Sequence, residues 1–211
     1  MRAFRFWLGT ASALLLVSTV SVAATWHLTL GLRAWTSEDA RRIRVLETPV
    51  FLSPLELISP SGRRFFPWGV GEHPRRVYLL DFVYTRCQTL CSVLGNEFFQ
   101  LQETIRCADA DKHLALLSIS FDPRHDTPAQ LGRYASRMKA ADALWTIAVP
   151  SDATALRELL REAGIVVIDD EMGGFAHNGA ILVVSDPGRI VRVFDYADYR
   201  KALAFARSVA G

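Results

Sequence analysis

The sequence has too little of several residue types to belong to some common classes of protein. Three cysteines in 211 residues are too few, and odd in number, for a framework of disulfides. A formal net charge of +2 gives no argument for a nucleic-acid partner. The chain also has no internal repeat. Because 50% of its residues are hydrophobic, it can build a core without disulfide staples, and its length suits one domain plus an appendage.

Charge is absent from one long stretch near the N-terminus. Arg2 and Arg5 precede an apolar run, 6–32, that contains no charged residue and exceeds the roughly 20 residues that cross a bilayer as a helix. We therefore predict a membrane anchor over 1–32. The alternative is a cleaved secretory peptide, because small residues at 22–24 suit a cleavage site. Both interpretations place the main domain outside the cytoplasm, in the periplasm if the host is a bacterium.

The rest of the chain divides into a polar linker, 33–53, and a domain of alternating strands and helices, 54–211. This alternation predicts a central sheet covered by helices, and a closing hairpin makes its strand directions mixed. The fold class is α/β, a thioredoxin-like three-layer fold with an N-terminal β-hairpin. Strands are expected at 77–84, 114–121, 144–149, 180–184 and 190–194, and a hairpin at 55–66. Helices are expected at 92–106 and 199–210, with a third that starts at Asp126–Pro128. A fourth helix starts after Ser151 or Asp152, and its buried face carries Leu156, Leu159 and Leu160.

Two cysteines lie where the first long strand gives way to a helix. Thiols at a helix start are favoured as thiolates by the unpaired N–H groups and the helix dipole. Cys87 and Cys91 are at i and i+4, where Cβ atoms on a regular helix are about 5–6 Å apart. A relaxed disulfide needs them at roughly 3.5–4.5 Å. The spacing favours a shared metal ion and leaves oxidation to a disulfide open.

A histidine is the natural third partner of such a pair. Soft thiolates select Cu(I) or Zn(II), and imidazole suits both. His177 lies in the loop 173–179, just before the strand at 180–184. In a thioredoxin-like layout this loop faces the helix start that carries the cysteines. The other histidines are interpreted as belonging to the membrane edge, to loops or to solvent: His27, His73, His113 and His125.

Three motifs resemble those of one known family. Phe82–Cys91 (FVYTRCQTLC) looks like the cysteine motif of the Sco/SenC family of copper chaperones. Ser118–Pro128 (SISFDPRHDTP) resembles its second signature, and Ala176–His177, before a strand and an Asp-Pro-Gly turn, resembles its third. The resemblance covers roughly residues 50 to 210. It implies a thioredoxin-like fold, one membrane anchor, and copper held by Cys87, Cys91 and His177.

The resemblance also implies a function. Such a protein delivers copper to, or reduces cysteines of, the binuclear copper site of cytochrome c oxidase during assembly. The expected partners are the copper-site subunit of the oxidase or another copper chaperone, with the membrane contacted through the N-terminal helix. We interpret the chain as a metallochaperone rather than an enzyme. Two alternatives stay open: an extracytoplasmic thiol-disulfide oxidoreductase that uses the pair Cys87 and Cys91, and a redox or copper sensor.

The sequence departs from the family pattern beside the cysteines. The family usually has proline after each cysteine and an acidic residue between them, where this chain has Gln88, Ser92 and Thr89. The missing carboxylate favours Cu(I), which needs only three soft ligands, over Cu(II). One alternative for Asp122 and Asp126 is a supporting role around the metal ligands; we interpret them instead as a turn residue and a helix cap, and Cys107 as a partly buried free thiol.

Overall fold

The computed structural model describes residues 2–70, 76–86, 90–107, 113–141, 143–170 and 173–211, and of 2–6, 8, 9 and 90–95 the backbone alone. The described chain forms two compact units, Met1–Glu47 and Thr48–Gly211.

The first unit is helical. Helix α1 spans Arg2–Leu28, and within it the 19 residues Thr10–Leu28 are apolar enough to cross a membrane, with none of the stretch buried by protein. Helix α2 spans Ser37–Glu47, inside the predicted linker, where the sequence has a short helical pattern at 37–45. An exposed helix of this hydropathy suits a membrane anchor or a signal segment, as the sequence predicted.

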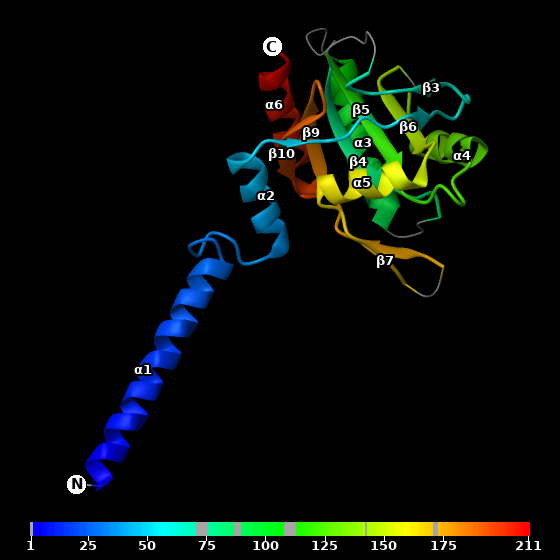
Figure 1. Cartoon of the computed structure of the whole chain (residues 1–211). Helices are drawn as coiled ribbons and strands as arrows, with labels where there is room; N and C mark the ends of the chain where they lie inside the picture. The colour runs from blue at the N-terminus through cyan, green and yellow to red at the C-terminus, as the bar shows by residue number, and fades with distance from the viewer. Residues whose placement is uncertain (1, 71–75, 87–89, 108–112, 142, 171–172) are drawn as a thin grey trace. The chain divides into compact units, whose positions relative to one another are not determined.

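The second unit is built on a mixed sheet (Figure 1), which confirms the predicted fold class. Its strand order is β1-β10-β9-β4-β5-β6-β2-β3. Strands β4, β5 and β6 are parallel, whereas β9 and β10 run antiparallel to them. The bounds are β1 Val50–Phe51, β2 Leu57–Ile58, β3 Arg64–Phe65, β4 Val77–Val83, β5 Leu114–Ser120, β6 Trp145–Pro150, β9 Ile181–Ser185 and β10 Arg189–Phe194.

Helices cover both faces of this sheet, as expected for parallel strands joined by helical crossovers. Helix α3, Leu90–Arg106, contacts both α4, Pro128–Met138, and α6, Tyr199–Ala210. Helix α5, Ala153–Ala163, lies in front of the strands, on the side opposite α3 (Figure 1). The polar residues that end the preceding loops set the helix starts: Thr127 caps α4 and Asp152 caps α5.

The predicted core is confirmed with one exception. Strand β5 is buried along its whole length, and β4 along all but one residue. Leu156 and Leu159 are buried on α5, but Leu160 is only half-buried. The sequence did not predict β1 or the separate two-stranded sheet of β7, Val167–Asp169, and β8, Phe175–His177. We refer to β7 and β8 as the arm.

A carboxyl group is buried in the middle of the sheet. Asp81 is 2% exposed, hydrogen bonds with the Ser118 hydroxyl, and has its Oδ1 atom without a partner among the described residues. The Ser118 hydroxyl also accepts a hydrogen bond from Trp145 Nε1 at 2.9 Å. Burial raises the pKa of Asp81 to about 7, because a charged carboxylate is poorly solvated between packed strands.

This burial predicts a pH-dependent cost in stability. A carboxyl whose folded-state pKa is raised stabilises the fold fully below its unfolded pKa of 3.8 and loses that contribution as the pH rises toward 7. We expect Asp81→Asn to be more stable than the wild type at neutral pH, by at most about 4 kcal/mol. The advantage should grow between about pH 4 and 7 and vanish below pH 4. Thermal unfolding of the intact protein in detergent, followed by near-ultraviolet circular dichroism, measures it.

Asp152→Asn provides a control of opposite sign. The Thr154 and Ala155 amides lower the pKa of Asp152 by donating to its carboxylate, so this substitution should destabilise the protein at neutral pH and lose its effect in acid. An advantage of Asp81→Asn that does not change with pH would contradict the assignment.

Candidate metal centre

The pairing of β9 with β4 determines where His177 lies. The two strands are antiparallel, with Leu80 opposite Leu182. The start of β9 therefore lies at the carboxyl end of β4, the end that leads to Cys87. His177 is the last residue of β8, four residues before β9. The sequence placed it in a loop; it instead pairs with Val167 in the arm.

His177 is half-buried and packs against two aromatic rings. Its ring centroid lies 5.0 Å from that of Phe121 and 6.5 Å from that of Tyr84. Both ring nitrogens, Nδ1 and Nε2, are buried and have no hydrogen-bond partner among the described residues. Burial lowers the pKa of His177, because the charged imidazolium is poorly solvated there. The side chain is therefore neutral at physiological pH, which is the form that binds metals.

Tyr84 fastens the arm to the sheet. Its hydroxyl donates a hydrogen bond to the Phe175 carbonyl and accepts one from the Phe175 amide, both at 3.3 Å. The Tyr84 and Phe175 rings also meet edge to face, with centroids 5.3 Å apart. Since Tyr84 directly follows β4 and Phe175 belongs to β8, this contact links the approach to the cysteines with the strand that carries His177.

The cysteines themselves are described only in part. Cys87 lies outside the described residues, and Cys91 is placed by its backbone in the first turn of α3. Within the described part of the chain, no cluster of three or more His, Cys, Asp or Glu side chains has metal-binding geometry. The ligand set Cys87, Cys91 and His177 thus stays a prediction.

Two buried aspartates hold the residues just before Cys87. Asp126, which is 1% exposed, accepts hydrogen bonds from the Thr85 amide at 3.0 Å and the Thr85 hydroxyl at 2.6 Å. It also accepts one from the Ser120 hydroxyl at 2.6 Å. Asp126 is therefore not the cap of α4, as one interpretation of the sequence had it; Thr127 is. Asp126 instead joins the end of β5 to the loop that enters the cysteine motif.

Asp122 makes a second link to the same loop. Its carboxylate forms an ion pair with Arg86 at 2.9 Å and contacts His125 Nδ1 at 2.9 Å. Arg86 immediately precedes Cys87 in the sequence. His125, expected to be solvated, is thus half-exposed and paired. Cys107 is a free thiol, but exposed rather than partly buried.

Among the described residues, His177 alone has the form of a candidate metal ligand. A buried imidazole without a hydrogen-bond partner is costly unless something binds it. A metal ion would supply that partner, and thiolates from Cys87 and Cys91 would be its natural other ligands. The fold and this site define a class: a thioredoxin-like domain with a histidine near the edge of the sheet where its central strand ends.

Comparison with known proteins identifies the family. The sequence model of the family described as SCO1/SenC matches residues 71–208, so the chain belongs to the SCO1/SenC family. A curated relative, the SCO1 protein homolog of Bacillus subtilis (strain 168), is 22% identical over 121 residues. The alignment covers 56% of this chain and 62% of that protein. The chain thus spans less than two thirds of the curated relative it matches.

Solved structures share the fold. The structure of BsSco, described as a member of the Sco family of cytochrome c oxidase assembly proteins with a disulfide switch, matches with a TM-score of 0.65 at 19% identity. It covers 77% of this chain and 95% of its own. Copper-bound ScoI of Arabidopsis thaliana matches with a TM-score of 0.61 at 16% identity, covering 75% and 99%.

The sequence did not identify Tyr84 as a supporting residue of the site, and for Asp122 and Asp126 a turn and a helix cap were preferred to a supporting role. The roles of Tyr84, Asp122 and Asp126 depend on contacts with residues 36 to 91 positions away. The sequence did contain one indication of these roles. A polar motif directly follows a buried strand, and in this fold the parallel strands end at the same edge of the sheet.

The Asp126 contacts predict a coupled loss of stability and metal affinity. Asp126→Ala leaves the Thr85 amide, the Thr85 hydroxyl and the Ser120 hydroxyl without their acceptor. Since hydrogen bonds to charged groups contribute about 1.5–3 kcal/mol each, we expect a loss of about 3 kcal/mol or more in the free energy of unfolding. We also expect roughly tenfold weaker Cu(I) binding, measured by competition with a chromogenic Cu(I) chelator.

Asp152→Ala is the matched control. It also removes a carboxylate that accepts two backbone N–H groups, but these belong to α5 and not to the cysteine loop. It should lower stability by less and leave Cu(I) affinity unchanged. Equal effects of the two substitutions on Cu(I) affinity would show that Asp126 has no special link to the site.

Proposed function

We propose that this protein is a membrane-anchored copper chaperone. It holds Cu(I) with Cys87, Cys91 and His177 and delivers it to, or reduces cysteines of, the binuclear copper site of cytochrome c oxidase during assembly. Its partner is the copper-site subunit of the oxidase or another copper chaperone. Membership of the SCO1/SenC family supports this proposal, as do relatives described as copper-bound or as oxidase assembly proteins.

The observation that carries the proposal is the unpartnered imidazole. His177 has two buried ring nitrogens without hydrogen bonds, and its lowered pKa keeps it neutral. It stands at the end of the strand that leads to the cysteines. Two thiolates and a neutral imidazole form a soft ligand set that suits Cu(I). Copper is here the cargo, bound in one partner and released to the next by exchange of ligands, without a change of oxidation state.

Removal of the imidazole tests the three-ligand site. We expect His177→Ala to weaken Cu(I) binding by roughly a hundredfold or more, since changes that merely touch a ligand's support cost about 10–100-fold. The measurement is an anaerobic competition titration of the reduced, intact protein with a Cu(I) chelator. His113→Ala is the control. His113 is exposed and directly precedes β5, at the edge of the sheet opposite the one where His177 lies. The His113→Ala variant should bind Cu(I) as the wild type does.

The same titration separates the main alternative. If His177→Ala binds Cu(I) as tightly as the wild type, the three-ligand site is wrong. The thiol-disulfide oxidoreductase that uses Cys87 and Cys91 then becomes the better hypothesis. A disulfide switch is described for BsSco, which favours a direct test of this alternative. The test measures whether the copper-free protein reduces a disulfide substrate.

The proposal places the domain outside the cytoplasm, in the bacterial periplasm, with helix α1 as its anchor. The apolar stretch Thr10–Leu28 supports an anchor by its length and composition. We expect the protein to stay in the membrane pellet after alkaline carbonate extraction and to keep its N-terminal residues by mass spectrometry. A soluble product that begins near Ala24 would show instead that the segment is a cleaved signal.

A further inference from the structure

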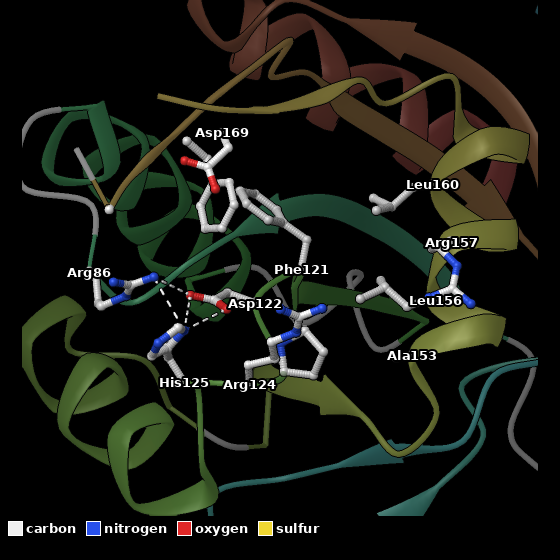
Figure 2. Close-up of a pocket in the computed structure, with 13 residues that line it drawn as sticks. Arg86, Phe121, Asp122, Arg124, His125, Ala153, Leu156, Arg157, Leu160 and Asp169 are labelled. Atoms are coloured by element: carbon white, nitrogen blue, oxygen red, sulfur yellow. Dashed lines mark hydrogen bonds and ion pairs between the residues drawn. The ribbon is translucent and has the colours of Figure 1, made fainter. Parts of the chain in front are cut away.

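A cleft of about 570 Å³ opens beside the candidate metal centre (Figure 2). Four segments of the chain meet around it: the loop after β4, the loop after β5, the first turns of α5, and the arm. This volume is in the range of sites that take a small ligand or an anchoring side chain. The cleft therefore has room for a specific occupant.

The interior of the cleft is apolar. Phe121 and Leu156 are buried, with 7% and 4% exposure, while Leu160 and Phe175 are half-buried. Figure 2 shows the Leu156 and Leu160 side chains reaching from α5 toward Phe121. The partial exposure of Leu160, which an ordinary core position would not have, follows from its place on this wall. An apolar side chain would replace water here favourably.

Three arginines line the cleft, together with Asp122, which pairs with Arg86, and Asp169 of the arm. Arg86 and Arg157 lie on opposite sides of the cleft, with Arg124 between them (Figure 2). Arg86 is ion-paired with Asp122 at 2.9 Å. Arg157 donates to the Thr154 hydroxyl of its own helix at 3.0 Å. Within the described part of the chain, neither Arg124 nor Arg157 forms an ion pair with a carboxylate, so two guanidinium groups remain for a ligand.

The cleft is continuous with the metal centre. Phe121 lines the cleft and also lies 5.0 Å, ring to ring, from His177. Phe175 likewise lines it and is bonded to Tyr84. Whatever fills the cleft therefore touches Phe121, which packs against His177, and Phe175, which packs against Tyr84. A protein that takes copper from His177 must cover this same edge of the sheet.

We propose that the cleft is the docking site for an acidic segment of the protein that exchanges copper with this one. An apolar side chain of the segment fills the floor between Phe121 and Leu156, and adjacent carboxylates pair with Arg124 and Arg157. This inference rests on the proposed function. To the proposed function it adds the chemical character of the partner's docking segment, which carries an apolar side chain flanked by negatively charged residues. Charge complementarity of this kind speeds encounter and sets orientation more than it adds affinity.

The test is copper transfer between whole proteins. Full-length protein in detergent, loaded with Cu(I), is mixed at low salt with the soluble copper-site domain of cytochrome c oxidase from the same organism, and transfer is followed by rapid mixing. We expect the double substitution Arg124→Glu/Arg157→Glu to slow second-order transfer roughly tenfold or more. The wild-type rate should fall as sodium chloride is raised, and the rate of the variant should change much less.

A matched charge reversal controls for net charge. Arg133→Glu/Arg200→Glu changes the same number of exposed arginines away from the cleft and should transfer copper at nearly the wild-type rate. Equal slowing by both double variants would overturn the proposal, as would no slowing by Arg124→Glu/Arg157→Glu. Ile168→Ser tests the other face of the arm, where Ile168 is 61% exposed. Slow transfer by this variant alone would move docking to that face.

Failure of this inference is distinguishable from failure of the proposed function. Arg124→Glu/Arg157→Glu should keep Cu(I) affinity within about twofold of the wild type, because neither arginine contacts His177, whereas His177→Ala should lose it. If the wild type holds Cu(I) and transfers it, but the cleft variant transfers equally fast, only the docking site is wrong. If the wild type transfers no copper to the oxidase domain, that failure lies with the proposed recipient.

Discussion

The antiparallel pairing of β9 with β4 is the constraint on which the site depends. Because Leu182 lies opposite Leu80, the chain must arrive at the start of β9 from the edge where β4 ends. This brings His177 to the strand that leads to Cys87, although 90 positions separate them in the sequence. The pairing is stabilised by the packing of two strands that are almost wholly buried, so the position of the histidine is a consequence of the core.

The polar side chains around the site position neighbouring segments of the chain. Asp126 and Asp122 hold Thr85 and Arg86, the two residues before Cys87, against the end of β5. Tyr84 holds the arm in the same way through both polar groups of Phe175. His177 is left without a hydrogen-bond partner among the described residues. The supporting side chains thus have hydrogen-bond partners, whereas the imidazole has none among the described residues. This arrangement is expected where a ligand binds the imidazole and completes the site.

The candidate metal centre and the cleft beside it would give the proposed copper chaperone two adjacent surfaces with different roles. Burial of the His177 ring lowers its pKa and keeps the imidazole neutral, which is the form that binds a soft ion. The adjoining cleft has an apolar floor and two arginines that form no ion pair with a carboxylate in the described part of the chain, which suits the proposed recognition of an acidic partner. Phe121 belongs to both surfaces, because it lines the cleft and contacts His177. A partner docked as proposed would therefore contact a residue that packs against the candidate ligand, so recognition and transfer would be coupled.

The sequence by itself determined the fold class, most of the strands and helices, and the identity of the candidate ligands. Long apolar runs indicate buried strands, the polar residues at 126–127 and 151–152 indicate helix starts, and two cysteines with a distant histidine predict a soft metal site. Only the tertiary structure decided what surrounds those residues. The arm, the tie between Asp126 and Thr85, and the exposure of Leu160 in a cleft all depend on contacts between segments far apart in the chain. A local sequence pattern does not predict such contacts. A short strand or a buried carboxylate is stabilised by its neighbours in space rather than by its neighbours in sequence.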